Sequence, residues 1–534
     1  MKIRKIADAM YSIGENILIY LFLIMIGILA LFSLIFTESA NNMLEQFMVL
    51  SVDKIYLTVP IMLVMVGLCI LAGIIAKRCG KNTITVLVAV VCVWYFVCGA
   101  MLFFFARSAP GADAMTVYYM AESVSRGDLS IVDAQNSYLS YYPQQIGLVT
   151  FLAIILKGLH LFKLPAEEYH FIKFVYLFLI CIAMVAQNYI VRRLWKSDFV
   201  NAVFLVLSAI NLPYILYATF IYSEIPSYCF FSVGACLLTA LLSEDGKEAD
   251  AIDKKDKIKN MLTAIASIIM FALAVMLRKN VLVLIIAVVI TVFFKWLKSK
   301  KWEWLIYISA CIACCVAILP FVLWGYEQLA GSEISSGVTA KSYFAMGMQE
   351  GGRGPGWYNG FNFSTFEAAD KKPEVADIIS EAAIEESLQN FKEHPGYAAR
   401  FYSRKISTQW LDGTYASLQA TYATVSNRAD FFWQVYEGKY TDGFIAICNA
   451  FQSLVYISVF LCMLRLVIKK ENNCFWKYLF AICVVGGFLF HIIWEANSRY
   501  IVTYSLLLIP YASKGIANMY DVSVAKLNKN RKQL

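Results

Sequence analysis

Long apolar runs separated by short polar segments follow one another along most of the chain. A helix that crosses a bilayer needs about twenty predominantly apolar residues, and residues 17–37, 55–76 and 83–106 each supply such a run. Further runs occupy residues 174–191, 199–222, 227–243, 260–277, 280–294, 304–326, 443–464, 478–494 and 500–513. The pattern predicts an all-α polytopic membrane protein with about twelve transmembrane helices.

Composition supports this class and excludes a soluble protein. Hydrophobic residues make up 60% of the 534 positions and charged residues only 16%, with a mean hydropathy of +0.62. The net charge of +8 does not require a nucleic-acid partner, because the basic residues gather in short segments between apolar runs. None of the fourteen cysteines falls in the two long polar stretches, so we expect no disulfides.

The basic segments set the predicted orientation. Lys77, Arg78 and Lys81 follow the second run, and Arg192 and Arg193 follow the fourth. Since basic loops stay in the cytoplasm, both termini should be cytoplasmic, and the polar segments on the other side should be extracytoplasmic.

The segment 143–162 is ambiguous, because its uncharged part is too short to cross a bilayer. If it crossed, Arg192 and Arg193 would be outside. We therefore expect an interfacial or re-entrant helix on the outer surface.

Four sections are predicted. They are a transmembrane hairpin at 1–82, a transmembrane core at 83–326 with an outer loop at 107–168, an extracytoplasmic loop region at 327–442, and C-terminal helices with a basic cytoplasmic tail at 443–534. The loop region contains a Gly-rich aromatic stretch, residues 347–363, and a helix-like piece, residues 374–392. We find no repeat of fixed period.

In this topology the unusual polar residues converge on the outer side. Asp113 is the first carboxylate past an outward helix, which makes it a candidate general base, and Glu224 at another outer turn is its rival. Candidate substrate-binding residues are Tyr142, Gln144, Gln145, Arg278, Lys279, Glu495, Asn497, Arg499 and Tyr500.

Each group of cations allows two interpretations. Only fourteen uncharged residues separate Arg499 from Lys514, so Arg499 should be drawn toward the hydrocarbon boundary, where it pairs either with Glu495 or with a ligand. Arg278 and Lys279 have no acid near them in the sequence. They either bind a phosphate or reach toward lipid head groups.

The order of these features resembles the GT-C superfamily of membrane glycosyltransferases, which includes protein O-mannosyltransferases and bacterial aminoarabinose transferases. The residues that carry the resemblance are the Asp113 loop, Tyr142-Pro143-Gln144-Gln145, Arg192-Arg193, Leu277-Arg278-Lys279 and the segment from Trp494 to Tyr500. The resemblance implies a polyprenyl-phosphate-linked sugar donor, a catalytic acid in the first large outer loop, and usually inversion at the anomeric carbon.

Sugar transfer to a hydroxyl-bearing glycan, lipid or protein acceptor in the cell envelope is thus the first hypothesis. A single Asp stands where some members of the superfamily carry an adjacent acidic pair, so dependence on a divalent metal is left open and no metal ligand is assigned. The alternative is a transporter or flippase for a lipid-linked or anionic substrate, although such proteins commonly show inverted repeats. A third hypothesis is that the protein is a non-enzymatic scaffold of the cell envelope.

Overall fold

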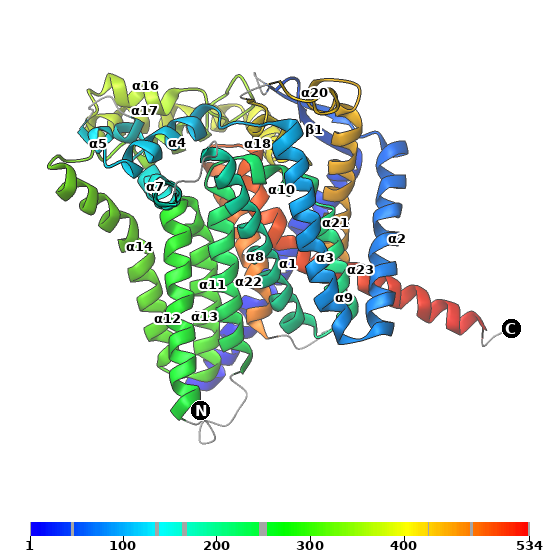
Figure 1. The fold of residues 1–534 in the computed structure, drawn as a ribbon. Coiled ribbons are helices and arrows are strands. Elements are labelled where there is room, and N and C mark those ends of the chain that lie inside the picture. The colour runs from blue at the N-terminus through cyan, green and yellow to red at the C-terminus, as the bar shows by residue number, and fades with distance from the viewer. Residues whose placement is uncertain are drawn as a thin grey trace.

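The computed structural model describes residues 2–43, 47–133, 138–162, 168–244, 254–424, 427–469 and 474–531. Within these ranges, eleven helices are long and apolar enough to cross a membrane, and a bent pair of helices makes a twelfth. The predicted all-α polytopic membrane protein is thereby confirmed. Figure 1 shows the long helices running side by side, with shorter helices gathered at one end of the bundle, which we call the loop end.

Ten of the eleven span candidates, all except Pro143–Leu161, form the bundle together with the helices Asp198–Ala209 and Val502–Arg531. These make twelve helices of the described chain. They are α1 (Lys2–Ile35), α2 (Ile55–Cys79), α3 (Lys81–Met101), α8 (Glu168–Trp195), α9 (Asp198–Ala209), α11 (Glu224–Glu244), α12 (Lys254–Leu277), α13 (Leu282–Ser299), α14 (Glu303–Ala330), α21 (Thr441–Lys469), α22 (Leu479–Ile493) and α23 (Val502–Arg531).

Shorter elements cover the loop end or join the long helices. They are β1 (Phe36–Ala40), β2 (Met48–Val52), η1 (Leu102–Ala106), α4 (Ala112–Ser125), α5 (Ser130–Asp133), α6 (Tyr138–Tyr141), η2 (Pro143–Gln145), α7 (Ile146–Leu161), α10 (Leu212–Leu216), η3 (Tyr217–Thr219), η5 (Lys279–Val281), α15 (Ala340–Gly347), α16 (Phe361–Ala368), α17 (Pro373–Glu393), α18 (Pro395–Trp410), α19 (Ser417–Ala420), α20 (Asp430–Glu437), η6 (Phe475–Tyr478) and η7 (Ser498–Ile501). The helix-like piece expected at 374–392 is α17.

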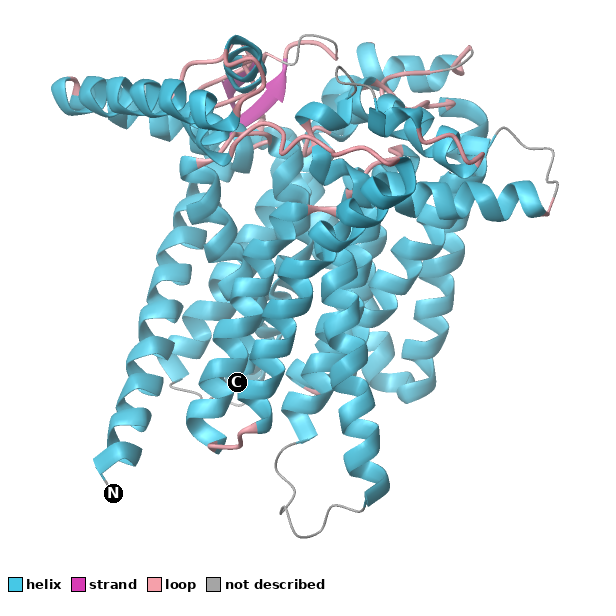
Figure 2. Cartoon of the chain, turned by 90° about the vertical axis from the view of Figure 1, so that its left-hand side faces the viewer, coloured by secondary structure: helices cyan, strands magenta, loops and turns pink. Residues whose placement is uncertain are grey.

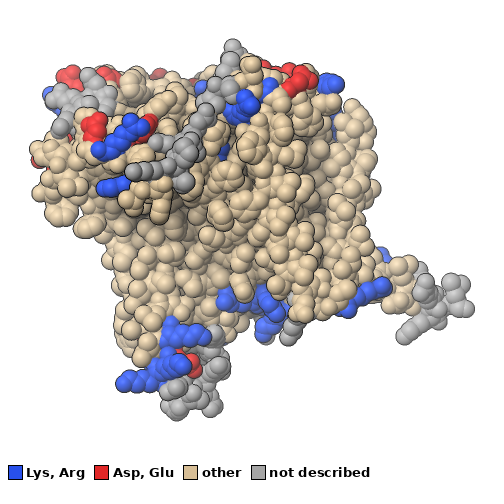
Figure 3. Space-filling model, viewed as in Figure 1, with Lys and Arg blue, Asp and Glu red and all other residues tan. Residues whose placement is uncertain are grey.

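Charged residues divide between the two ends of the bundle. Figure 3 shows basic residues along the lower edge, while acidic residues lie mainly at the loop end. The last turns of α2 and α8 carry Lys77, Arg78, Arg192 and Arg193. We call the end opposite the loop end the basic end.

Helix α7 lies across the bundle. The segment Pro143–Leu161 passes as a membrane span by length and composition. Figure 1, however, views α7 nearly end-on, whereas α12 and α13 run from top to bottom in the same view. This is the orientation of an interfacial helix and not of a helix parallel to the others.

The expected span 199–222 is not one continuous helix. It is broken into α9 and α10, which are bent by 57°. Asn211 caps α10 by accepting a backbone N–H, and Pro213 has no N–H to continue the α9 ladder. Trp94 donates to the free carbonyl of Ala209 at 2.9 Å, so a neighbouring helix satisfies the break.

The segment that joins the first two helices contains an antiparallel β hairpin. Its register pairs Phe36 with Val52 and Ala40 with Met48, and Figure 2 shows the two strands among the loop-end helices. Glu38 of β1 is fully buried and forms an ion pair with Arg404 of α18. The hairpin therefore anchors the first two helices to the loop region.

The leading pair of helices belongs to the bundle. Ser453 on α21 donates to the carbonyl of Ser33 on α1 at 2.8 Å. Helices α21 and α23 also approach closely, because a Cβ at Gly515 would lie 1.8 Å from the carbonyl oxygen of Ser458. The first and last sections of the sequence thus pack against each other.

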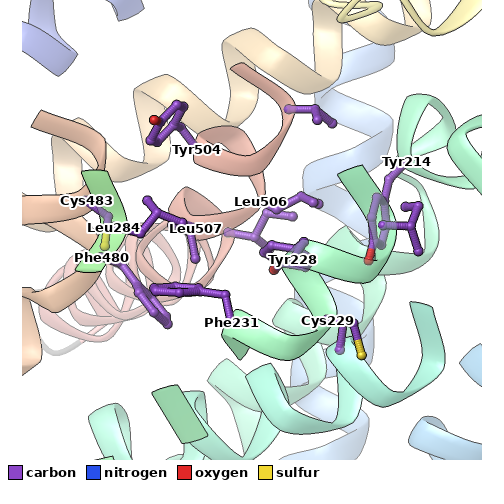
Figure 4. Packing of buried hydrophobic residues seen from close by; sticks show 14 of the residues in the cluster. Tyr214, Tyr228, Cys229, Phe231, Leu284, Phe480, Cys483, Tyr504, Leu506 and Leu507 are labelled. Atoms are coloured by element: carbon purple, nitrogen blue, oxygen red, sulfur yellow. The ribbon is translucent and has the colours of Figure 1, made fainter. Parts of the chain in front are cut away.

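Apolar and aromatic side chains from distant segments fill the centre of the bundle (Figure 4). The cluster includes Tyr214 of α10, Tyr228 and Phe231 of α11, Leu284 of α13, Phe480 and Cys483 of α22, and Tyr504, Leu506 and Leu507 of α23. This packing holds the ends of α11, α12, α13 and α22 in place at the loop end, where the polar residues meet.

Candidate functional site

A cavity of about 360 Å³ opens between the ends of the long helices and the loop-end helices. We call it the central cavity. All predicted site residues except Asn497 line it, namely Asp113, Tyr142, Gln144, Gln145, Glu224, Arg278, Lys279, Glu495, Arg499 and Tyr500. They come from α4, η2, α11, the α12–α13 turn and the turn after α22, so only the tertiary fold brings them together.

Glu224, at the start of α11, is the centre of an ion cluster. Its Oε1 lies 2.9 Å from Nη1 of Arg278 and 3.4 Å from Nε of Arg499. The side chain of Glu224 is only 3% exposed. Of the two interpretations for Arg499, the ion pair with Glu495 is not formed, because Arg499 pairs with Glu224 instead. Arg278, which has no acid near it in the sequence, also pairs with Glu224 in the fold.

This cluster changes the expected role of Glu224. A buried carboxylate enclosed by two guanidinium groups is already engaged by cations and is poorly placed to accept a proton from a substrate. The two arginines, in turn, are held with several N–H groups left over for a ligand, since each guanidinium carries five donors. Glu224 therefore positions the cations and is a weak candidate for a general base.

Aromatic rings flank the two arginines. The guanidinium of Arg278 lies 5.5 Å from the ring centre of Tyr500, and that of Arg499 lies 5.2 Å from the ring centre of Tyr222. Tyr222 also accepts a hydrogen bond of 2.6 Å from Nε2 of Gln145. The predicted residues Gln145 and Tyr500 thus help to orient the cation cluster.

Sequence reasoning missed part of the aromatic wall. Tyr343 stacks on Trp494 with ring centres 5.4 Å apart, and Tyr358 also lines the cavity. Both tyrosines come from the loop region. The only signal in the sequence for Tyr358 was the aromatic content of residues 347–363, which does not identify the residues that face a cavity, and Tyr343 lies outside that stretch.

Asp113 lies in the first turn of α4, and its side chain is exposed toward the cavity. The chain reaches this point through a left-handed residue, Arg107, and the carbonyl of Ala423 fixes the next turn by accepting from Ala109 N at 2.7 Å. Among the described residues no side-chain hydrogen bond or ion pair occupies Asp113. Its carboxylate is available to a ligand.

Glu495 is the second carboxyl group of the cavity wall, and it is buried. Burial raises its pKa to about 7, while Arg499 and a hydrogen bond from Tyr500 act in the opposite direction. Lys405 of α18 lies behind it, fully buried, and burial lowers the pKa of this amine to about 7. The protonation states of both groups change near neutral pH.

The turn that carries Glu495 is clamped by the loop region. Ala496 N donates to Gly356 O at 2.7 Å, and Lys405 donates to the carbonyl of Gly347. Gly356 has a φ of +72°, and a Cβ there would lie 2.6 Å from Cε of Lys405, so glycine is required.

Asn497, the predicted site residue outside the cavity, has a structural role. Its Oδ1 accepts from the backbone N–H of Arg499 at 2.9 Å and caps the short helix η7. Asn497 does not line the central cavity, and its cap sets the direction in which Arg499 leaves the chain.

Within the described residues, no three His, Cys, Asp or Glu side chains gather as a metal site would require. Asp113 and Glu495 are the acidic groups of the cavity wall that two arginines do not hold. The cavity wall presents a carboxylate, fixed cations and aromatic rings to a ligand.

These features define a multi-pass α-helical membrane protein with a charged, aromatic-lined cavity at one end of its bundle. The chain belongs to the family described as conserved hypothetical integral membrane protein, whose model matches residues 10–515. No curated protein matches the chain. The family description names the membrane and no reaction.

Proposed function

We propose that this protein is a membrane glycosyltransferase that moves a sugar from a polyprenyl-phosphate donor to an acceptor hydroxyl. The main support for the proposal is that one cavity contains both the carboxylate of Asp113 and a fixed pair of cations, Arg278 and Arg499. Among the described residues, Asp113 has no ion pair or side-chain hydrogen bond. The resemblance of the motifs to the GT-C superfamily points to the same chemistry.

The proposed reaction assigns one task to each group. Asp113 takes the proton of the acceptor hydroxyl, whose oxygen forms a bond to the anomeric carbon. The bond from that carbon to the phosphate oxygen breaks, and the polyprenyl phosphate leaves with the electron pair. Arg278, Arg499 and the neighbouring Lys279 stabilise the charge that grows on the phosphate.

The membrane supplies the donor, and the proposed orientation puts the cavity outside. The concentration of Lys and Arg at the basic end (Figure 3) favours a cytoplasmic location for that end. Both chain termini and the basic tail would then be cytoplasmic, and the central cavity would face the extracytoplasmic side of the cell membrane, where envelope glycans are assembled.

One observation favours the alternative of a transporter or flippase: helix α9–α10 is broken, as spans of many transporters are. The break is, however, closed by hydrogen bonds from Trp94 and Tyr95 to the carbonyls of Ala209 and Ser208. None of these residues lines the central cavity. Hydrogen bonds within the protein therefore explain how the break is tolerated, and no path for a transported substrate is needed to explain it.

The test is transfer from labelled polyprenyl-phosphate monosaccharides by membranes that contain the wild-type chain or the Asp113→Asn variant. Asp113→Asn keeps the shape of the side chain and removes its basicity, so transfer should fall about 10²–10⁴-fold with donor binding retained. Glu122→Gln, which changes an acid on the same helix paired with Arg126, is the matched control and should retain activity. Near-normal transfer by Asp113→Asn would remove Asp113 from the mechanism.

A further inference from the structure

A second recess lies beside the central cavity, on the other side of Tyr358. It encloses about 670 Å³, and we call it the outer recess. Its walls are Tyr358, Arg353, Asn359 and two glycines of the same loop, together with Asn41 and Phe47 at the end of the β hairpin. Because Tyr358 lines both spaces, the two are neighbours that share one side chain.

Hydrogen bonds hold the walls of the outer recess in place. Met48 N donates to the carbonyl of Arg353 at 3.0 Å and joins the hairpin to the Gly-rich loop. The amide of Asn359 donates to Oε1 of Gln349 at 3.0 Å and accepts from the backbone N–H of Phe361 at 2.9 Å. The recess is therefore a built feature of the loop end, preorganised before any ligand arrives.

The recess contains an uncompensated cation. Arg353 is half-buried, and among the described residues its guanidinium makes no ion pair and no side-chain hydrogen bond. The rings of Phe47 and Tyr358 are 49% and 41% exposed beside it. A guanidinium binds phosphate and carboxylate oxygens through parallel hydrogen bonds, and exposed rings offer flat faces to sugars.

Tyr358 and Asp113 lie close together. Burial is the main cause of the raised pKa of Tyr358, and the charge of Asp113 adds to it. A chain lying in the outer recess would therefore have its end near the proposed base if it passed Tyr358. The donor, in contrast, is expected at Arg278 and Arg499, on the central-cavity side.

We propose that the outer recess is the acceptor subsite and that it binds a negatively charged, hydroxyl-bearing glycan chain through Arg353. This inference rests on the proposed function. The anionic group would be a phosphate or carboxylate, on a chain that is either free in the envelope or attached to a lipid.

The first experiment measures binding directly. A cysteine is placed in the outer recess by Gly352→Cys, where a Cβ meets open space, and its reaction with a membrane-impermeant maleimide is followed in sided proteoliposomes. Phosphorylated dextran fragments should slow the reaction roughly tenfold, the range of one hydrogen bond to a charged group, and neutral dextran should not. Adding Arg353→Gln should remove the protection, whereas Arg400→Gln, the same change at an exposed position, should keep it.

Equal protection by both dextrans, or protection that survives Arg353→Gln, would overturn the proposal. The second experiment then uses the maleimide adduct at position 352 as a plug. It should stop transfer to the envelope acceptor while donor binding to the purified protein stays within about twofold of the unmodified variant. Labelled product in the organic phase identifies a lipid-linked acceptor, and product in the aqueous polymer fraction identifies a free one.

The two proposals fail in different ways. If transfer continues at the normal rate with the plug in place, the acceptor subsite is wrong, and the transferase proposal stands. If the wild-type protein neither binds nor uses a polyprenyl-phosphate sugar, the transferase proposal falls, and the acceptor subsite falls with it.

Discussion

At the scale of single residues, the site is controlled by how burial and charge are distributed among three acids. Asp113 is exposed and unoccupied, Glu224 is buried between two arginines, and Glu495 is buried beside a lysine. The same functional group thus serves three purposes, because its surroundings differ in each place.

Glu224→Gln should damage the structure more than the chemistry. Removing one partner of a buried ion pair leaves uncompensated charge, here on Arg278 and Arg499, and costs about 3–5 kcal/mol. Thermal unfolding of the purified protein in detergent should show a clear loss of stability. Asp113→Asn is the comparison, because its exposed side chain should leave unfolding unchanged. A stable Glu224→Gln protein would mean that the cluster does not hold the cavity together.

Donor binding should weaken as pH rises through about 7, the pKa to which burial raises Glu495. Below that pH Glu495 is neutral and the cavity is more positive, which favours an anionic phosphate. Above it Glu495 becomes negative and Lys405, whose pKa is also about 7, loses its charge. Both changes therefore weaken binding of an anion.

The measurement is the affinity for a labelled polyprenyl-phosphate sugar between pH 5.5 and 8.5, roughly 1.5 units on either side of that value. Glu495→Gln should flatten most of the dependence and leave the smaller contribution of Lys405. If the Gln variant shows the same pH profile as the wild type, Glu495 does not titrate in this range.

At the scale of elements, α7 shows how orientation separates two helices of similar composition. Its sequence is apolar enough to span a membrane, yet it lies across the bundle (Figure 1). The chain changes direction between α6 and α7, where η2 leads directly into α7. Helix α7 then packs against α4 and α14.

This orientation predicts that both ends of α7 face the same side. Cysteines placed at the exposed positions Asp128 and Lys157 should both react with an impermeant thiol reagent added to intact cells, whereas one at Lys77 of the basic end should not. Reaction at 128 together with protection at 157 would mean that α7 crosses the membrane, and the assignment of sides would then have to be redrawn.

At the scale of the whole molecule, the chain forms one bundle in which the loop region is part of the cavity wall. Tyr343 and Tyr358 from this region face Glu495 and Arg499 from the last helices. The loop region is therefore expected to depend on the bundle for its conformation, and the bundle to depend on the loop region for its site.

The architecture also predicts that the protein does not carry its substrate across the bilayer. The central cavity is lined by residues at the loop end, and none of residues 198–219, which contain the bent pair of helices, lines it. In proteoliposomes, the rate at which a fluorescent lipid-linked sugar changes leaflet should equal that of protein-free vesicles. A rate that depends on the protein and is lost in Arg278→Gln would support the transporter alternative.

Much of this molecule follows from its sequence alone. Runs of about twenty apolar residues specify membrane helices because the bilayer has a fixed thickness, and basic segments mark one side because charge is distributed unequally across membranes. These are local properties, so they indicated the helical class, the polar segments between the helices and ten of the residues that line the central cavity.

The tertiary structure alone decided which of these groups meet. The pairing of Glu224 with Arg278 and Arg499, the contribution of Tyr358 and the outer recess depend on segments far apart in the chain. Composition contains no information on such pairings, because a buried charge is stabilised by whatever packing brings within a few ångströms of it. The sequence predicted the chemistry of the site, and the packing of α11, α12 and η7 assigned its roles.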